Sequence, residues 1–204
     1  FVPIENIHWQ MSGTVLIMTL FGGTGTLPAN FSTHTLNAAG TVEYSGSAQN
    51  VSAETYGHLT TSGSGTKTLA GAIIVAGTLT LGPSTTLDTS ASNFGISVAG
   101  NWVNNGGAFS AGTGTVTFNG TGAQAINGTS ASQTFNNVTI SMTAGQTLSV
   151  SGSTTALTVN NLTETTGNFT APATLDINGT LTLTAGTFTA GANITIAGDW
   201  TKAT

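Results

Sequence analysis

Pairs of apolar residues two positions apart recur along most of the chain. The step between their first members varies from about 14 to about 23 residues and averages about 19 residues, close to the repeat lengths of solenoid proteins. Residues i and i+2 of a strand face the same side, so each pair predicts a short strand with one buried face. Thr61 is the one polar member of the set, which comprises Val42/Tyr44, Leu59/Thr61, Ile73/Val75, Ile96/Val98, Val116/Phe118, Val138/Ile140, Leu157/Val159, Leu175/Ile177 and Ile194/Ile196.

A repeat of this length is typical of a solenoid, in which each coil of the chain stacks on the one before. Roughly three strand-like pieces fit within each step, and Gly, Asn, Ser and Pro separate them. No segment shows a sustained helical period. The sequence therefore predicts an all-β fold, a right-handed parallel β-solenoid (β-helix) of nine rungs, with about 19 residues and three short strands per coil.

A longer, multi-coil repeat is superimposed on the coils. Residues 97–102 (Ser-Val-Ala-Gly-Asn-Trp) match residues 195–200 (Thr-Ile-Ala-Gly-Asp-Trp), and residues 40–46 match residues 114–120. These segments resemble bacterial β-strand-repeat surface proteins, which are filamentous, adhesin-like parallel β-solenoids. The resemblance covers residues 40–204 and implies a surface scaffold without a defined catalytic site. Members of that family usually carry many more repeat units than this chain.

Residues 1–39 fit the repeat less well and form a separate N-terminal segment ahead of the solenoid at 40–204. Its residues 14–21 are the most apolar stretch of the chain. Three interpretations remain open at this stage. The stretch is a first solenoid rung or cap, or a donor strand that adds to a neighbouring subunit, or a helix. Phe1 and Glu5, which resemble the mature start of a type IV pilin, favour the helix, whereas Pro3 and Gly13 interrupt it.

The charge content limits the partners of the protein. Only 4% of the 204 residues are charged, the two basic ones are lysines, and the net charge is -5. Such a chain has no basic surface for nucleic acid or for an anionic membrane. Copies of it repel one another weakly, which favours self-assembly. The regular apolar pairs and 38% hydrophobic residues argue against disorder. No apolar run is long enough for a transmembrane helix.

The sequence offers little catalytic chemistry. It has no cysteine, its carboxylates are scattered, and its three histidines lack metal-ligand spacing. We therefore expect no enzyme activity, no cofactor and no metal site; a polysaccharide lyase, which uses a basic group, is the weaker alternative. Trp102 and Trp200 are expected to pack in the core or at a corner, with a sugar-stacking platform as the alternative. The Thr-x-Thr motifs suggest ice binding as a further alternative function, but the irregular coil lengths argue against it.

The favoured function is an extracellular, cell-surface structural protein, a subunit or segment of a filament that assembles from copies of itself. The rival is an adhesin or carbohydrate-binding module with surface glycans as partners. The C-terminal end shows no capping helix, proline or charge cluster, so we expect its strands to join the apolar strand of a neighbour. The predicted assembly residues are Val15, Leu16, Ile17, Met18, Leu20, Phe21, Ile194, Ile196 and Trp200.

Overall fold

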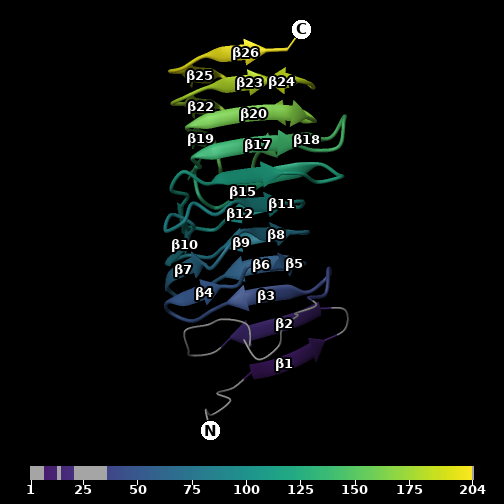
Figure 1. The fold of residues 1–204 in the computed structure, drawn as a ribbon, viewed down its shortest axis with the longest axis vertical. Helices are drawn as coiled ribbons and strands as arrows, with labels where there is room; N and C mark the ends of the chain where they lie inside the picture. Colours follow the sequence, from purple (N-terminus) through teal and green to yellow (C-terminus); the bar gives the residue numbers. More distant parts are fainter. Residues whose placement is uncertain (1–6, 13–14, 21–35, 204) are drawn as a thin grey trace.

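The protein folds into a stack of eight coils, seen from the side in Figure 1. The structure is a computed structural model, and it describes residues 7–12, 15–20 and 36–203, the first two ranges by their backbone alone. Each coil contributes three short strands, one to each of three faces, so the cross-section is triangular. The described residues contain no helix, and therefore no helix that could cross a membrane. The predicted parallel β-solenoid with three strands per coil is confirmed.

Four sheets make up the three faces. The first face is sheet A, which comprises β1 (Ile7–Ser12), β2 (Val15–Leu20), β3 (Thr41–Tyr44), β6 (His58–Thr61), β9 (Leu79–Leu81), β12 (Trp102–Asn104), β15 (Gln124–Gly128), β18 (Thr147–Val150), β21 (Asn168–Thr170) and β24 (Phe188–Thr189). The second face is sheet C, which comprises β5 (Thr55–Tyr56), β8 (Ile73–Val75), β11 (Ile96–Val98), β14 (Thr115–Phe118), β17 (Asn137–Ser141), β20 (Asn161–Thr166), β23 (Leu181–Leu183) and β26 (Trp200–Lys202).

The third face is divided into two sheets that do not pair with each other. Sheet B covers the first four coils, and its strands are β4 (Gln49–Val51), β7 (Gly65–Leu69), β10 (Thr85–Asp88) and β13 (Ala108–Ser110). Sheet D covers the last four coils, and its strands are β16 (Ser132–Thr134), β19 (Ala156–Val159), β22 (Thr174–Ile177) and β25 (Asn193–Ile196). Every described strand pair is parallel except β1 with β2, which is antiparallel.

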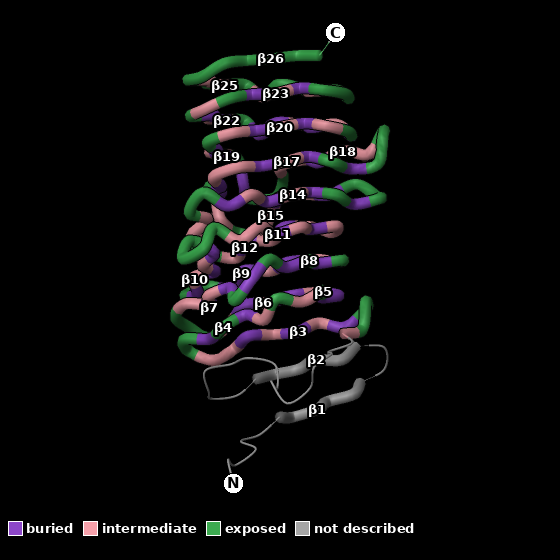
Figure 2. Tube along the Cα trace, viewed as in Figure 1, coloured by how far each residue is buried: buried purple, intermediate pink, exposed green. Residues whose placement is uncertain are grey.

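The apolar pairs face inward, as predicted. All of them are buried except Ile194/Ile196 of β25, which are partly buried against the core. Figure 2 shows this pattern as buried residues that alternate with less buried ones along the strands. Thr61 is also inward: its hydroxyl lies 2.9 Å from that of Thr85, which donates to the Gly82 carbonyl at 2.8 Å. A buried hydroxyl with a partner costs little, which explains one polar member in the set.

The prediction of nine rungs is wrong, because the nine pairs do not lie on one face. The first two belong to sheet A, the next four to sheet C and the last three to sheet D. Where two consecutive apolar pairs lie on different faces, the number of residues between them is smaller or larger than that of a full coil. The strand register gives the true extent of a coil, which runs from Thr41 to its partner His58 in a short coil and from Trp102 to its partner Ile126 in a long one.

An aromatic cluster fills the core where sheet B gives way to sheet D. The Trp102 ring lies edge-on to Phe109 and Phe135, each with ring centroids 4.9 Å away. The Trp102 Nε1–H donates to Gln133 Oε1 at 3.1 Å, and Asn104 Nδ2 donates to the same oxygen at 2.8 Å. The buried indole therefore has both its apolar contacts and its hydrogen bond. Gln133 and Phe135 belong to the fifth coil, and Trp102 to the fourth.

Candidate assembly site at the C-terminal end

The last described coil leaves one edge of each of its strands without a partner strand. β24, β25 and β26 stand at the end of sheets A, D and C, respectively. The core-facing side chains of β25 and β26 stack on those of the preceding coil. Trp200 is in register with Leu181, and Ile194 and Ile196 are in register with Leu175 and Ile177. No later strand of the described chain covers these side chains: Leu181 is 2% exposed, whereas Trp200 is 63% exposed. Figure 2 shows β26 exposed along its whole length.

These side chains surround a hollow in the C-terminal end with a volume of about 680 Å³. Its wall is mainly apolar, and Lys202 is its only charged lining residue among those the structure describes. The lining side chains include Leu181, Leu183, Phe188, Ile194, Ile196 and Trp200. The last described coil thus presents an open section through the core, and no described strand pairs with the outer main-chain donors and acceptors of β24, β25 and β26.

The corner before β26 has the same backbone arrangement as the corner before β12. Gly198 N donates to the Gly179 carbonyl at 2.9 Å, and Gly100 N donates to the Gly77 carbonyl at 3.0 Å. A Cβ at either Gly198 or Gly100 would collide with the glycine of the preceding coil, so both corners require glycine. The sequence match between residues 97–102 and 195–200 therefore corresponds to one local structure: a strand, a glycine corner and a strand that starts with tryptophan.

The matching segments lie on different faces of the solenoid. Residues 97–102 run from sheet C into sheet A, whereas residues 195–200 run from sheet D into sheet C. Likewise, residues 40–46 contain a strand of sheet A and residues 114–120 a strand of sheet C. Trp102 packs in the core as expected, but the same expectation is wrong for Trp200. The indole of Trp200 occupies a core-facing position that no following coil of the described chain covers.

A buried carboxylate lies beneath the hollow. Glu164 of β20 is 1% exposed, and its Oε2 has no hydrogen-bond partner among the described residues. Glu164 is in register with Leu183 of β23, which is in register with Lys202 of β26. Burial raises the pKa of Glu164, and the charge of Lys202 opposes that increase. Sequence reasoning missed this residue, although Leu162 and Glu164 are two positions apart on one strand, the same signal that identified the apolar pairs.

A second buried charge among the described residues is Lys67 of β7, which is fully buried. Its ammonium donates to the carbonyls of Ser47 at 2.9 Å and Ser64 at 2.8 Å, and also to that of Gly46. Burial lowers the pKa of this lysine. Three carbonyl oxygens from two corners therefore hold the cation in place of water. Lys67 and Leu69 again show the spacing of an inward pair, so the sequence carried a signal for this position too.

At the other end of the stack, two strands extend sheet A alone. β2 pairs in parallel with β3 and antiparallel with β1, so both of its edges are occupied within the chain. Five of the predicted assembly residues lie in β2: Val15, Leu16, Ile17, Met18 and Leu20. Phe21 lies outside the described residues. β2 is a strand continuous with the solenoid, and the donor-strand role remains a prediction. Among the described strands, β1 has the free outer edge of sheet A.

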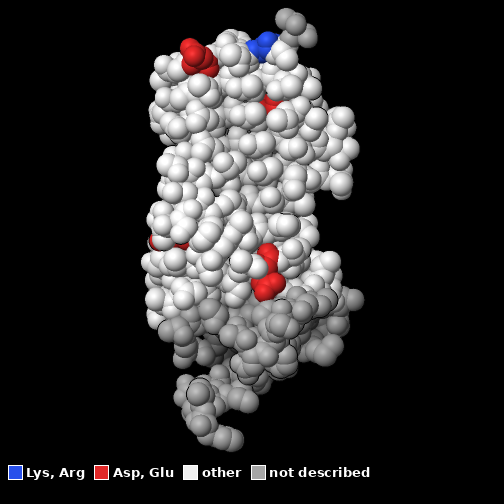
Figure 3. All heavy atoms as spheres, viewed as in Figure 1, with Lys and Arg blue, Asp and Glu red and all other residues white. Residues whose placement is uncertain are grey.

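The outward side chains of sheet C form an ordered column of hydroxyl groups. Thr117, Thr139, Thr163, Thr182 and Thr201 occupy one register position on five successive strands. The irregular coil lengths do not disturb this column, because extra residues lie in corners such as 89–95, between β10 and β11. Figure 3 shows how few charged groups reach the surface on one side of the molecule.

The described residues bring together no group of three or more His, Asp or Glu that could hold a metal ion. His58 Nδ1 accepts a hydrogen bond from the Thr78 amide at 2.9 Å, which makes it part of a corner. Searches against models of known families, against curated proteins and against solved structures each gave no significant match.

Proposed function

We propose that this protein is an extracellular structural protein, a subunit or segment of a surface filament whose copies join end to end through β-strand contacts. The exposure of core-facing Trp200 on the last described coil, beside the only partly buried Ile194 and Ile196, carries the proposal. Parallel sheets are normally covered, and an open edge with apolar neighbours is a template for another chain. The low charge of the chain, and its resemblance to bacterial β-strand-repeat surface proteins, support the same role.

The partner in this proposal is a second copy, whose N-terminal end carries residues 14–21. A terminal strand would gain main-chain hydrogen bonds, and apolar side chains in the wall of the hollow would lose contact with water. A junction held mainly by such contacts depends weakly on salt. Because β2 is already paired on both sides, the neighbour contacts the outer edge of β1 or displaces the β1–β2 pair.

The test compares two substitutions on adjacent residues of β25. Ile196→Asp places a charge at a core-facing position of the terminal coil, whereas Thr195→Asp places it on the exposed outer face. We expect Ile196→Asp to shorten the particles seen by electron microscopy and light scattering, and Thr195→Asp to leave their length unchanged. Filaments of normal length from folded Ile196→Asp would contradict the proposed junction. A full-length protein that stays monomeric at high concentration would contradict filament formation.

The threonine column of sheet C favours a second candidate function, an adhesin module that binds an ordered surface such as a glycan array or ice. Regularly spaced hydroxyls, about 4.8 Å apart from coil to coil, suit a repeating ligand. Thr163→Lys would interrupt the column, and Thr158→Lys on sheet D is the matched control. Binding to insoluble polysaccharides and inhibition of ice recrystallisation are the measurements. Equal behaviour of both variants would remove this candidate.

A further inference from the structure

The outer face of sheet C carries hydrogen-bonding side chains at regular positions over five successive strands. The threonine column described above supplies one hydroxyl per coil on β14, β17, β20, β23 and β26. Threonine is β-branched and therefore stiff about χ1, and each threonine of the column has another one on a neighbouring strand. The column thus presents its hydroxyl and methyl groups in an ordered row.

A second column runs beside the first, two residues earlier on each strand. Thr115, Asn137 and Asn161 share one register position on β14, β17 and β20. The amides form a ladder along the axis: Asn161 Nδ2 donates to Asn137 Oδ1 at 2.8 Å, and Asn137 Nδ2 donates to the Thr113 carbonyl at 2.9 Å. Asn161 Oδ1 accepts a hydrogen bond from the Thr180 amide at 2.9 Å. Side chains that are already held in place lose less freedom when a ligand binds.

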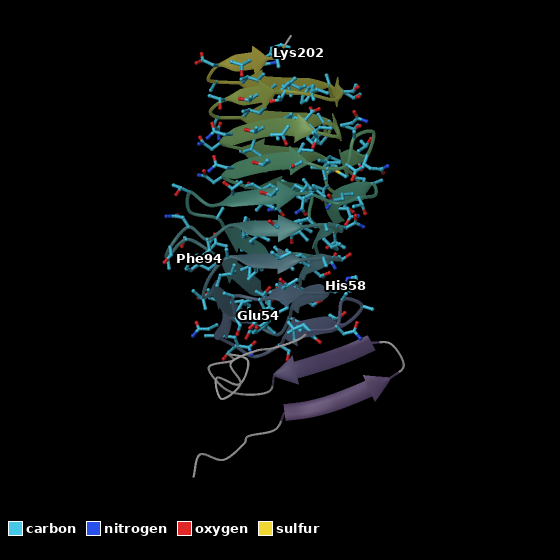
Figure 4. All side chains as sticks on the ribbon, turned by 45° about the vertical axis from the view of Figure 1, so that its right-hand side comes forward. Glu54, His58, Phe94 and Lys202 are labelled. Atoms are coloured by element: carbon cyan, nitrogen blue, oxygen red, sulfur yellow. The ribbon has the colours of Figure 1, made fainter. Side chains whose placement is uncertain are left out.

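The outer side of these strands is uncharged. The outward positions of β14, β17, β20 and β23 hold only Thr, Asn and Ser, and Glu164 of β20 faces inward and is buried. Glu54 and Lys202, which Figure 4 labels, lie near opposite ends of the stack. A charged group orients the water around itself, so a face without charges leaves the order of the adjacent water to its hydroxyls and amides. An uncharged partner therefore suits this face.

The other faces interrupt their outward columns. On sheet D, Asp176 is in register with Thr158. On sheet A, Val103 is in register with Thr80, and Glu43 with Thr60. The regular array therefore distinguishes sheet C, and Thr158 offers a control position of the same residue type on another face.

The spacing of the threonine column fits a tetrahedral network of water. Neighbouring strands lie about 4.8 Å apart, and so do equivalent side chains on successive coils. In tetrahedrally bonded water, hydrogen bonds of about 2.75 Å place two oxygens that share a neighbour about 4.5 Å apart. The mismatch of about 0.3 Å per coil adds up to about 1.2 Å along the column, which is less than half the length of one hydrogen bond. One continuous water lattice can therefore follow the whole column.

The same strands carry no aromatic side chain at an outward position of β14, β17, β20 or β23. Aromatic rings cover apolar surface and leave their polar edges wet, which suits the apolar face of a sugar ring. Hydroxyls and amides alone suit a ligand that consists entirely of hydrogen-bonding groups. Of the two ordered surfaces considered above, these residues favour ice over a glycan array.

We propose that the outer face of sheet C binds ice, through a layer of ordered water held by the threonine column and the neighbouring amide ladder. This inference rests on the adhesin candidate and names the ordered surface that the module binds. It does not depend on filament assembly, because β14, β17, β20 and β23 each pair with a strand on both sides within the described chain. The threonine methyl groups lie between the hydroxyls and fill gaps in the water layer.

The experiment uses the full chain and measures inhibition of ice recrystallisation and the fraction of protein taken up by slowly growing ice. Thr163→Tyr places a ring in the middle of the sheet C column, and Thr158→Tyr places the same ring on sheet D. We expect Thr163→Tyr to increase the concentration that stops recrystallisation at least about tenfold, equivalent to about 1.4 kcal/mol of binding. Thr158→Tyr should leave that concentration nearly unchanged. Circular dichroism verifies that both variants are folded, and binding to insoluble polysaccharides is measured in parallel.

An added aromatic ring interrupts a water lattice but does not oppose contact with sugars, so the tyrosine variants separate the two ligands. Loss of ice activity in Thr163→Tyr alone supports the proposal. A natural chain that neither slows recrystallisation nor enters ice overturns it, and so does equal ice activity in the two variants. If that natural chain binds an insoluble polysaccharide, the adhesin candidate stands with a different ligand. A chain that binds neither ice nor polysaccharide overturns both the inference and the adhesin candidate.

Discussion

The fourth coil and the eighth coil share a similar local sequence, but their tryptophans differ in burial. Gly100-Asn101-Trp102 and Gly198-Asp199-Trp200 both turn over a glycine of the preceding coil, yet Trp102 is fully buried and Trp200 is 63% exposed. The two lysines differ in the same way: Lys67 is enclosed by carbonyls, whereas Lys202 lies at the rim. What differs within the described chain is that a following coil covers Trp102 and Lys67, whereas no described coil follows Trp200 and Lys202. Burial in a solenoid is thus a property of neighbours along the axis.

The largest effect should come from a charge placed in a covered coil. Ile177→Asp introduces a carboxylate at a position that is 1% exposed, whereas Asp176→Ala removes one from the outward position beside it. We expect Ile177→Asp to lower the free energy of unfolding by more than about 4 kcal/mol, since apolar burial is lost and an unpaired charge is buried. Asp176→Ala should change it by about 0.5 kcal/mol or less. Similar melting shifts for the two variants would contradict the inward assignment of Ile177.

The tryptophan pair tests the comparison itself. Trp102→Ala removes a buried indole, its edge-to-face contacts and its bond to Gln133, and should cost about 3–5 kcal/mol of stability. Trp200→Ala should barely change the stability of the subunit but should weaken association. Chemical denaturation and light scattering at increasing concentration separate the two effects. A subunit that is destabilised equally by both substitutions would show that the last coil is covered within the chain.

The inward positions and the three-strand coil could be predicted because strand alternation is local. Leu175-Asp176-Ile177 is sufficient to place Asp176 outward, whichever face the strand joins. The number of coils could not be obtained in the same way, because an inward pair such as Leu157/Val159 carries no label that assigns it to sheet A, C or D. Face assignment depends on which strands pair, and that is set by corner lengths and packing across the core.

The candidate site was only partly accessible from sequence. Ile194 and Ile196 could be placed on the last coil, because they are the last members of the periodic series, and Trp200 could be singled out because residues 195–200 match residues 97–102. Glu164 and Lys67 were overlooked, although their spacing from Leu162 and Leu69 is the spacing of an inward pair. A charged residue at an inward position contradicts the usual preference for burial. Whether such a residue is tolerated depends on groups that are distant in the sequence and that only the folded coils bring near. These groups are the corner carbonyls for Lys67 and the lysine at the rim, Lys202, for Glu164.

The smallest effect concerns the pH dependence of the stability of the single subunit. Because burial raises the pKa of Glu164 above its value in the unfolded chain, the folded subunit binds a proton more tightly than the unfolded chain does. Stability from this residue is therefore fully present below the unfolded pKa, about 4.3, and is lost as pH rises through the folded pKa. Glu164→Gln cannot ionise, so it should be more stable than the natural chain at neutral pH and similar to it near pH 3.5. The comparison is made by denaturation at concentrations too low for association, with Asp176→Asn as the outward control. If the Glu164-dependent stability of the natural chain instead increased with pH, Lys202 would already hold the carboxylate ionised in the free subunit. The last coil would then resemble a covered coil in its electrostatics.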